Sequence, residues 1–154
     1  MLVKELLQEG LNKQKLIFDF GRGELDYTTE NGVFIFKSID LSNLGLTELP
    51  KEFRQIKYKC SGNFYCSYNN LTSLEGAPTL VRGHFYCGYN KLTSLEGAPS
   101  SVGGSFYCPG NKLTSLQGAP TSIHGNFYCY DNKNQFTKQE VQAVSTVRGG
   151  IYVG

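Results

Sequence analysis

The sequence has no apolar run that approaches the roughly 18 residues needed for a membrane-spanning helix. Its beginning, MLVKELLQE, also lacks the unbroken apolar stretch and the small-residue cleavage site of a secretory signal peptide. Five cysteines without a secretion signal indicate reduced thiols. We therefore expect a cytoplasmic protein with no membrane partner.

A large excess of one charge is missing as well. The 15 Lys and Arg residues face 13 Asp and Glu residues, and the resulting net charge of +2 argues against a bulk polyanion binder. Catalytic groups are also few. The two histidines, His84 and His124, have no repeated acidic neighbour, no paired carboxylates are evident, and Gly21-Arg22-Gly23 lacks the rest of a phosphate loop. These absences predict a protein that is not an enzyme and needs no cofactor.

Glycine, by contrast, is abundant at 18 of 154 residues, which indicates many tight turns. The glycines belong to an internal repeat. Residues 62–82 and 83–103 are identical at 15 of 21 positions, residues 104–124 form a third copy, and a fourth begins at Gly125 and then breaks off. A degenerate earlier unit begins at Ile39 with an offset of 25 residues instead of 21. The repeat therefore dominates the fold prediction.

Each copy predicts one coil of a solenoid. In Phe85-Tyr86-Cys87 the alternation places Phe and Cys on one face of a short strand and Tyr on the other. The phrase Leu-Thr-x-Leu continues the apolar lining, and Gly-Ala-Pro ends the coil, because Pro cannot continue a strand. Val81, Val102 and Ile123 return to the core. A single coil cannot bury its apolar edge, so the coils must stack into a parallel-strand solenoid of about four to five turns.

The spacing resembles that of the leucine-rich repeat family. Its template appears as Val81, Phe85, Cys87, Asn90 and Leu92, with one extra residue after the first position and with Phe and Cys in place of Leu. The phrase N-x-L-T-S-L-x-G-A-P is similar to short repeat proteins of tailed bacteriophages. The resemblance covers about residues 26–154. It implies short parallel strands on a curved sheet with loop and turn returns, and a ladder of Asn side chains that satisfy neighbouring backbone groups, formed by Asn69, Asn90, Asn111 and Asn132.

We divide the chain into an N-terminal cap (1–38), the repeat coils (39–135) and a C-terminal cap (136–154). The first cap is expected to contain a helix, from an apolar stripe that begins at Leu2, and a hairpin that turns at Asn31-Gly32. In the second, Thr137 and Glu140 predict a capped helix whose Val141 and Val144 face the last coil. Residues 151–153 predict a final strand that covers the sheet edge.

Tyrosines recur on the face opposite the core and form the candidate partner-binding surface. Stacked tyrosines would stabilise strand pairing, and exposed aromatic patches also commonly mark binding sites, so the two roles are compatible. The flanking positions vary between copies, which favours recognition of a partner. The candidate residues are Tyr65, Tyr86, Tyr107 and Tyr128, with His84, Asn126, Ser67 and Tyr130 beside them.

Two further columns offer alternatives. Lys91, Lys112 and Lys133 could bind phosphates while the tyrosines stack on bases, which would make a single-stranded nucleic-acid site. Four cysteines recur every 21 residues, but a straight row cannot surround one tetrahedral ion, so we expect core positions and no metal. The exposure of Cys60 stays open.

The sequence thus predicts a protein-binding module that uses the concave face of its sheet. The resemblance to bacteriophage proteins implies a host bacterial protein as the partner, such as a defence factor that is inhibited or redirected in the host cytoplasm. The alternatives are the nucleic-acid binder and a structural subunit that stacks through the N-terminal helix, so the chain is expected to be a monomer or a small homo-oligomer.

Overall fold

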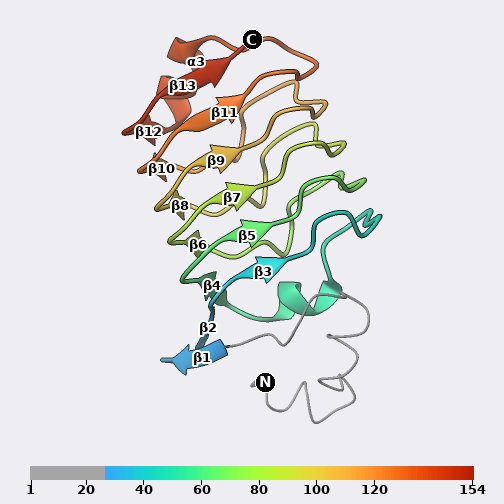
Figure 1. Cartoon of the computed structure of the whole chain (residues 1–154), viewed down its shortest axis with the longest axis vertical. Helices are drawn as coiled ribbons and strands as arrows, with labels where there is room; N and C mark the ends of the chain where they lie inside the picture. The colour runs from blue at the N-terminus through green and yellow to red at the C-terminus, as the bar shows by residue number, and fades with distance from the viewer. Residues whose placement is uncertain (1–26) are drawn as a thin grey trace.

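The computed structural model describes residues 27–154, and these form a parallel-strand β-solenoid (Figure 1). The predicted N-terminal helix at Leu2 lies outside the described residues. One sheet contains the Phe-Tyr positions of the repeat. Its strands are β3 (Ile39–Asp40), β5 (Phe64–Tyr65), β7 (Phe85–Tyr86), β9 (Phe106–Tyr107), β11 (Phe127–Cys129) and β13 (Ile151–Val153). These six strands correspond to about six turns, more than expected, because β13 adds a turn after the repeat has ended.

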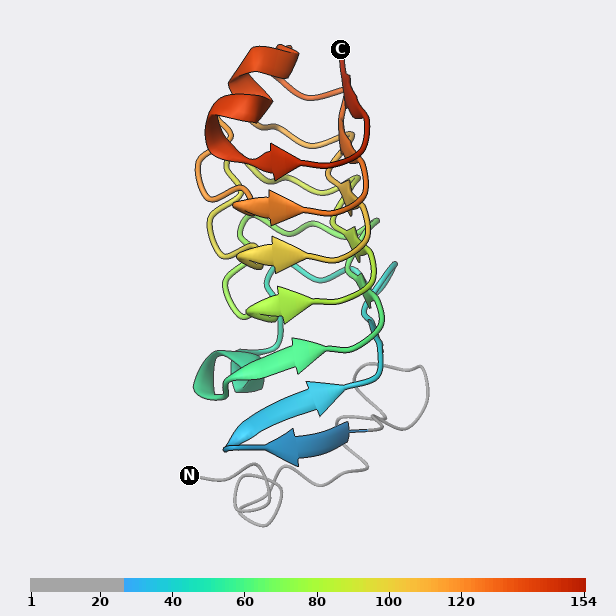
Figure 2. The ribbon, with the colours of Figure 1, turned by 90° about the vertical axis from the view of Figure 1, so that its left-hand side faces the viewer.

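The return half of each coil forms a second sheet, which the expectation of loop and turn returns missed. This sheet lies beside the first, and the turned view shows its strands as a regular stack (Figure 2). Its strands are β1 (Tyr27–Glu30), β2 (Val33–Phe36), β4 (Tyr58–Cys60), β6 (Leu80–Val81), β8 (Ser101–Val102), β10 (Ser122–Ile123) and β12 (Thr146–Val147). All neighbours are parallel except β1 and β2, which form the predicted hairpin with Asn31 and Gly32 at positive φ.

The core lies between the two sheets and consists of columns of identical or similar side chains. Phe64, Phe85 and Phe106 are fully buried, and the ring centroids of successive members are 5.3 Å apart. Val81 and Val102 line the opposite sheet and are also fully buried. In the Phe column each buried ring therefore contacts its own counterpart in the next coil, so the same packing repeats from coil to coil.

A ladder of asparagines closes the turn that follows each Phe-Tyr-Cys strand, as the resemblance implied. The Asn90 side chain accepts a hydrogen bond from Leu71 N–H at 3.0 Å and donates to the carbonyls of Cys66 and Cys87 at 2.9 and 3.1 Å. Asn69, Asn111 and Asn132 make the equivalent bonds. The amide satisfies backbone groups of two coils at once, which a Leu at this position could not do.

The helix α3 (Lys138–Val144) forms at the C-terminal end with the predicted capping box. Thr137 Oγ1 accepts from Glu140 N–H at 3.2 Å, and the Glu140 carboxylate accepts from Thr137 N–H at 2.7 Å. Val141 is buried as expected, whereas Val144 is 40 % exposed and lines a hollow together with Leu116 of a repeat coil. The return of the first coil contains a 3-10 helix (Lys51–Gln55), which accounts for its greater length.

Replacement of Asn69 by Ala should destabilise the fold strongly. It removes bonds to Leu44 and Leu46 N–H and to the Leu41 carbonyl, and leaves buried groups without partners. We expect a loss of about 3 kcal/mol in urea unfolding. The neighbouring Asn70→Ala removes a side chain that makes none of these bonds and should cost less than about 0.5 kcal/mol. Equal losses in the two variants would contradict the role given to the ladder.

Candidate binding face

The predicted tyrosine column exists and is one residue longer than predicted. Each ring stacks on the next with centroids 4.8, 4.5, 4.5 and 4.6 Å apart and planes within 12° of parallel. The column follows the paired strands β5, β7, β9, β11 and β13, which are stacked in this order in Figure 1. Its members are Tyr65, Tyr86, Tyr107, Tyr128 and Tyr152. Ring faces are therefore covered by other rings, and ring edges and hydroxyl groups face outward.

The tyrosine rings are spaced more closely than the core rings on the other side of the same strands. The tyrosine centroids are 4.5 to 4.8 Å apart, whereas those of Phe64, Phe85 and Phe106 are 5.3 Å apart. Burial and the neighbouring hydroxyls of Tyr107 and Tyr65 raise the pKa of Tyr86, which keeps this phenol neutral.

The column on one flank of the tyrosines has a structural role that the sequence did not reveal. The side chain in each coil accepts a hydrogen bond from the equivalent backbone N–H in the next coil. His84 N–H donates to Asn63 Oδ1 at 2.7 Å, Ser105 N–H to His84 Nδ1 at 2.9 Å, and Asn126 N–H to Ser105 Oγ at 2.9 Å. The row starts at Ser38 and ends at Gly150. We call it the acceptor column.

The prediction of partner recognition relied on the variation between coils at the positions beside the tyrosines, and the acceptor column offers a structural explanation for that variation. Ser, Asn and His differ in shape, but each supplies an acceptor atom at the same place, so the differences do not by themselves indicate recognition. Two members also contact the tyrosines. Asn63 and Asn126 donate to the hydroxyls of Tyr65 and Tyr128 at 2.7 and 2.9 Å. His84 lies between Tyr86 and Tyr107, 5.9 and 6.1 Å from their ring centroids.

The other flank of the tyrosine column is uneven. Ser67 is half-buried, Gly88 and Pro109 are buried, and Tyr130 is 38 % exposed. A Cβ on Gly88 would lie 3.0 Å from the Pro109 ring, so the backbone and the Pro109 ring are in close contact here. Of the predicted residues on this flank, Tyr130 presents the most surface.

Three exposed tyrosines were missed. Tyr152 continues the column and is 49 % exposed, but it lies beyond the end of the repeat, 24 residues after Tyr128. Tyr68 and Tyr89 are 60 % and 43 % exposed and stack on each other with centroids 4.7 Å apart. In the other coils, the position of Tyr68 and Tyr89 is occupied by Asn43, Gly110 and Asp131. Asn, Gly and Asp are the residues that adopt a left-handed backbone most readily, so the sequence did contain a signal for a left-handed turn at this position.

The lysine column is less regular than predicted. Lys91 and Lys112 are exposed, and their N–H groups donate to the Leu71 and Leu92 carbonyls. In the next coil Asn134 N–H, not Lys133 N–H, makes the equivalent bond to Leu113. Lys133 is exposed as well, but its N–H does not continue this backbone pattern.

All five cysteines, including Cys60, are buried and free. Burial raises the pKa of the Cys60 thiol to about 12 and also raises the pKa of Cys66, Cys87 and Cys108. Such thiols are not nucleophiles at neutral pH. Within residues 27–154, no three His, Cys, Asp or Glu side chains are grouped so that they could hold a metal ion.

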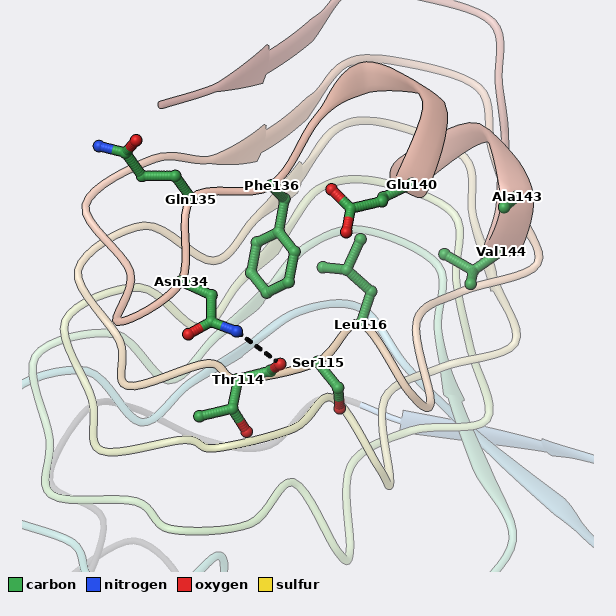
Figure 3. Close-up of a pocket in the computed structure, with 9 residues that line it drawn as sticks. All are labelled: Thr114, Ser115, Leu116, Asn134, Gln135, Phe136, Glu140, Ala143 and Val144. Carbon is green, nitrogen blue, oxygen red and sulfur yellow. Dashed lines mark hydrogen bonds between the residues drawn. The ribbon is translucent and has the colours of Figure 1, made fainter.

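A hollow of about 370 Å³ lies between the last coils and α3 (Figure 3). Its lining residues are Thr114, Ser115, Leu116, Asn134, Gln135, Phe136, Glu140, Ala143 and Val144. Glu140 is the ionisable member of this lining, and the hydrogen bonds from Thr137 lower the pKa of its carboxyl group. Because this carboxylate is already used in the capping box, the hollow offers no pair of groups for acid–base chemistry.

Comparison with known proteins gives no relative: no family model, curated protein or solved structure matches the chain. In the part of the chain that the structure describes, no helix is long and apolar enough to cross a membrane.

His84 provides a test of the acceptor column. His84→Ala removes the acceptor for Ser105 N–H and should lower the free energy of unfolding by about 1 to 2 kcal/mol. His84→Asn supplies the amide acceptor that Asn63 provides in the preceding coil and Asn126 provides two coils later, and should remain within about 0.5 kcal/mol of wild type. Urea unfolding at pH 7.5 distinguishes the two, and a loss of equal size in both variants would contradict the assignment.

The buried thiols predict a loss of stability in alkaline solution. In the unfolded chain a thiol has a pKa of about 8.5, whereas burial raises the pKa of the same thiol in the folded chain. The folded state therefore has its full stability below about pH 8.5 and loses stability as the pH rises above this value. Each thiol should contribute a slope of about 1.4 kcal/mol per pH unit. Urea unfolding between pH 7 and 9.5 measures it. Cys87→Val should reduce the slope by one thiol's share, and a stability independent of pH would contradict the prediction.

Proposed function

We propose that the protein is a non-catalytic module that binds another protein through the tyrosine column. The observation that supports this most directly is the stacking of five tyrosines in one plane-parallel row on an outer sheet face. Core packing does not require them, because Phe and Cys fill the interior from the same strands. Tyrosine contributes strongly to protein interfaces, and rings held on both sides lose little conformational freedom on binding.

The same stacking argues against the nucleic-acid alternative. Proteins that bind single strands stack bases on the faces of aromatic rings. Here centroids 4.5 to 4.8 Å apart leave no room for a base between rings. With three lysines in the column and a net charge of +2, the phosphate contacts would also be few. A protein surface, which contacts ring edges and hydroxyls, fits the column better.

The resemblance to bacteriophage repeat proteins supports a host bacterial protein as the partner. On this proposal the chain is an accessory factor that blocks or redirects a defence protein or a metabolic enzyme in the host cytoplasm. A rigid, preorganised surface loses little conformational entropy on binding, which favours tight binding of a folded host protein.

The proposal can be tested by affinity capture from nuclease-treated bacterial lysate. A single host protein held by wild type should be lost with Tyr86→Ala/Tyr107→Ala, with affinity at least about 30-fold weaker, because central tyrosines usually dominate an interface. Tyr86→Phe/Tyr107→Phe keeps the stack and separates the contribution of the hydroxyls. Circular dichroism and urea unfolding confirm that each variant is folded.

Thr72→Ala/Thr93→Ala, at two exposed turn positions, is the matched control and should bind as wild type does. Equal capture by wild type and the Tyr→Ala variant would contradict the proposed binding face. Capture that occurs only when nuclease is omitted would favour the nucleic-acid alternative.

A further inference from the structure

One position in each coil has a left-handed backbone, and its occupants are chemically unequal. The φ angles of Asn43, Tyr68, Tyr89, Gly110 and Asp131 are 56°, 58°, 56°, 63° and 55°. The position immediately precedes each ladder Asn, or Leu44 in the first coil. Gly, Asn and Asp adopt this conformation readily, whereas a bulky side chain there is an outlier. Two coils therefore hold a residue type that their backbone disfavours.

Burial does not compensate for this strain. Tyr68 and Tyr89 are 60 % and 43 % exposed, among the most exposed large side chains of the described residues. Their rings stack on each other, and a Cβ on Gly110 would lie 2.6 Å from Cδ1 of Tyr89, so the Tyr89 ring also covers this glycine. The solenoid forms the same turn elsewhere with Asn, Gly or Asp, so the fold does not need these tyrosines.

The surroundings of the pair indicate the chemistry of what it contacts. Stacking covers the electron-rich ring faces and leaves the positive ring edges and the hydroxyl donors outward. Lys91 and Lys112 follow the left-handed position by two residues and are exposed. The carboxylates of the nearby turns are engaged elsewhere, Glu75 with Arg54 and Glu96 with Gln117. Asp131 occupies the left-handed position two coils after Tyr89 and is an exposed acidic side chain.

We propose that Tyr68 and Tyr89, together with Lys91 and Lys112, form a contact site for an acidic segment of the protein partner. The inference rests on the proposed function and adds the chemistry of the partner to it. Ring edges, hydroxyl donors and ammonium groups are all complementary to carboxylates and backbone carbonyls. The tyrosines are retained for recognition at the expense of an unstrained turn.

The first test separates recognition from structure. Tyr68→Asn and Tyr89→Asn place at each turn the residue that the first coil uses, so their urea midpoints should equal or exceed that of wild type. Tyr107→Asn, at an extended position stacked on both sides, is the control and should lower the midpoint. A lowered midpoint for Tyr68→Asn and Tyr89→Asn as well would mean that the pair is a structural brace, and would overturn the proposal.

The second test measures binding with defined probes. A decapeptide of alternating Glu and Ser, titrated into the ¹⁵N-labelled protein, should shift the amide resonances around Tyr68, Tyr89 and Lys91. A Gln-for-Glu peptide should not, and 0.5 M NaCl should weaken the effect at least several-fold. No shift with the acidic peptide, or shifts confined to other coils, would overturn the proposal. Equal shifts with a ten-residue deoxythymidine oligonucleotide would replace the acidic protein segment with nucleic acid.

The two proposals can fail separately. In the capture experiment, loss with Tyr86→Ala/Tyr107→Ala but full retention with Tyr68→Asn/Tyr89→Asn would overturn only the acidic contact site. Retention in both pairs of variants would overturn the proposed function together with it.

Discussion

Backbone hydrogen bonds between the strands of successive coils set the spacing of the coils in this protein. Phe64 N–H donates to the His84 carbonyl and Phe85 N–H to that of Ser105, a constant step of one coil. The step fixes the distance between strands and therefore between all equivalent side chains. Each column must consist of residues that tolerate their own copy at this distance. Aromatic rings, thiols and amides do so, and the lysines do so only at exposed positions, where water screens their repulsion.

The same coil-to-coil spacing explains why glycine recurs at the start of each copy and why the residues of the neighbouring acceptor column vary. Gly83 N–H donates to the Gly62 carbonyl, and a Cβ on Gly83 would collide with that carbonyl and with Asn63 Oδ1. Close approach, not unusual φ, therefore excludes side chains here. One residue later the acceptor column needs only an acceptor atom, so Ser, Asn and His interchange. Variation among copies is thus permitted by the structure and is weak evidence for recognition on its own.

Periodicity predicted what recurs at a fixed offset and missed what does not. The columns headed by Phe64, Tyr65 and Asn69 followed directly from the 21-residue spacing, and Thr137 with Glu140 predicted α3 from local chemistry. The second sheet was missed because its strands β6, β8, β10 and β12 have only two residues each and mixed residue types, such as Leu80 against Ser101. Tyr152 was missed because α3 precedes it and shifts its offset. Left-handed tyrosines contradict ordinary residue preferences, so preference could not predict them.

The tyrosine column also has two different ends. At one end Asp40 pairs with Tyr65 in the sheet, so the first ring is followed by a carboxylate side chain, whose oxygen accepts from Ser42 N–H. At the other end Tyr152 contacts Tyr128 with one face and is 49 % exposed. Between them the rings offer a uniform surface of edges and hydroxyls. The column is therefore bounded by different side chains, Asp40 at β3 and Tyr152 at β13, so its two directions are chemically distinct.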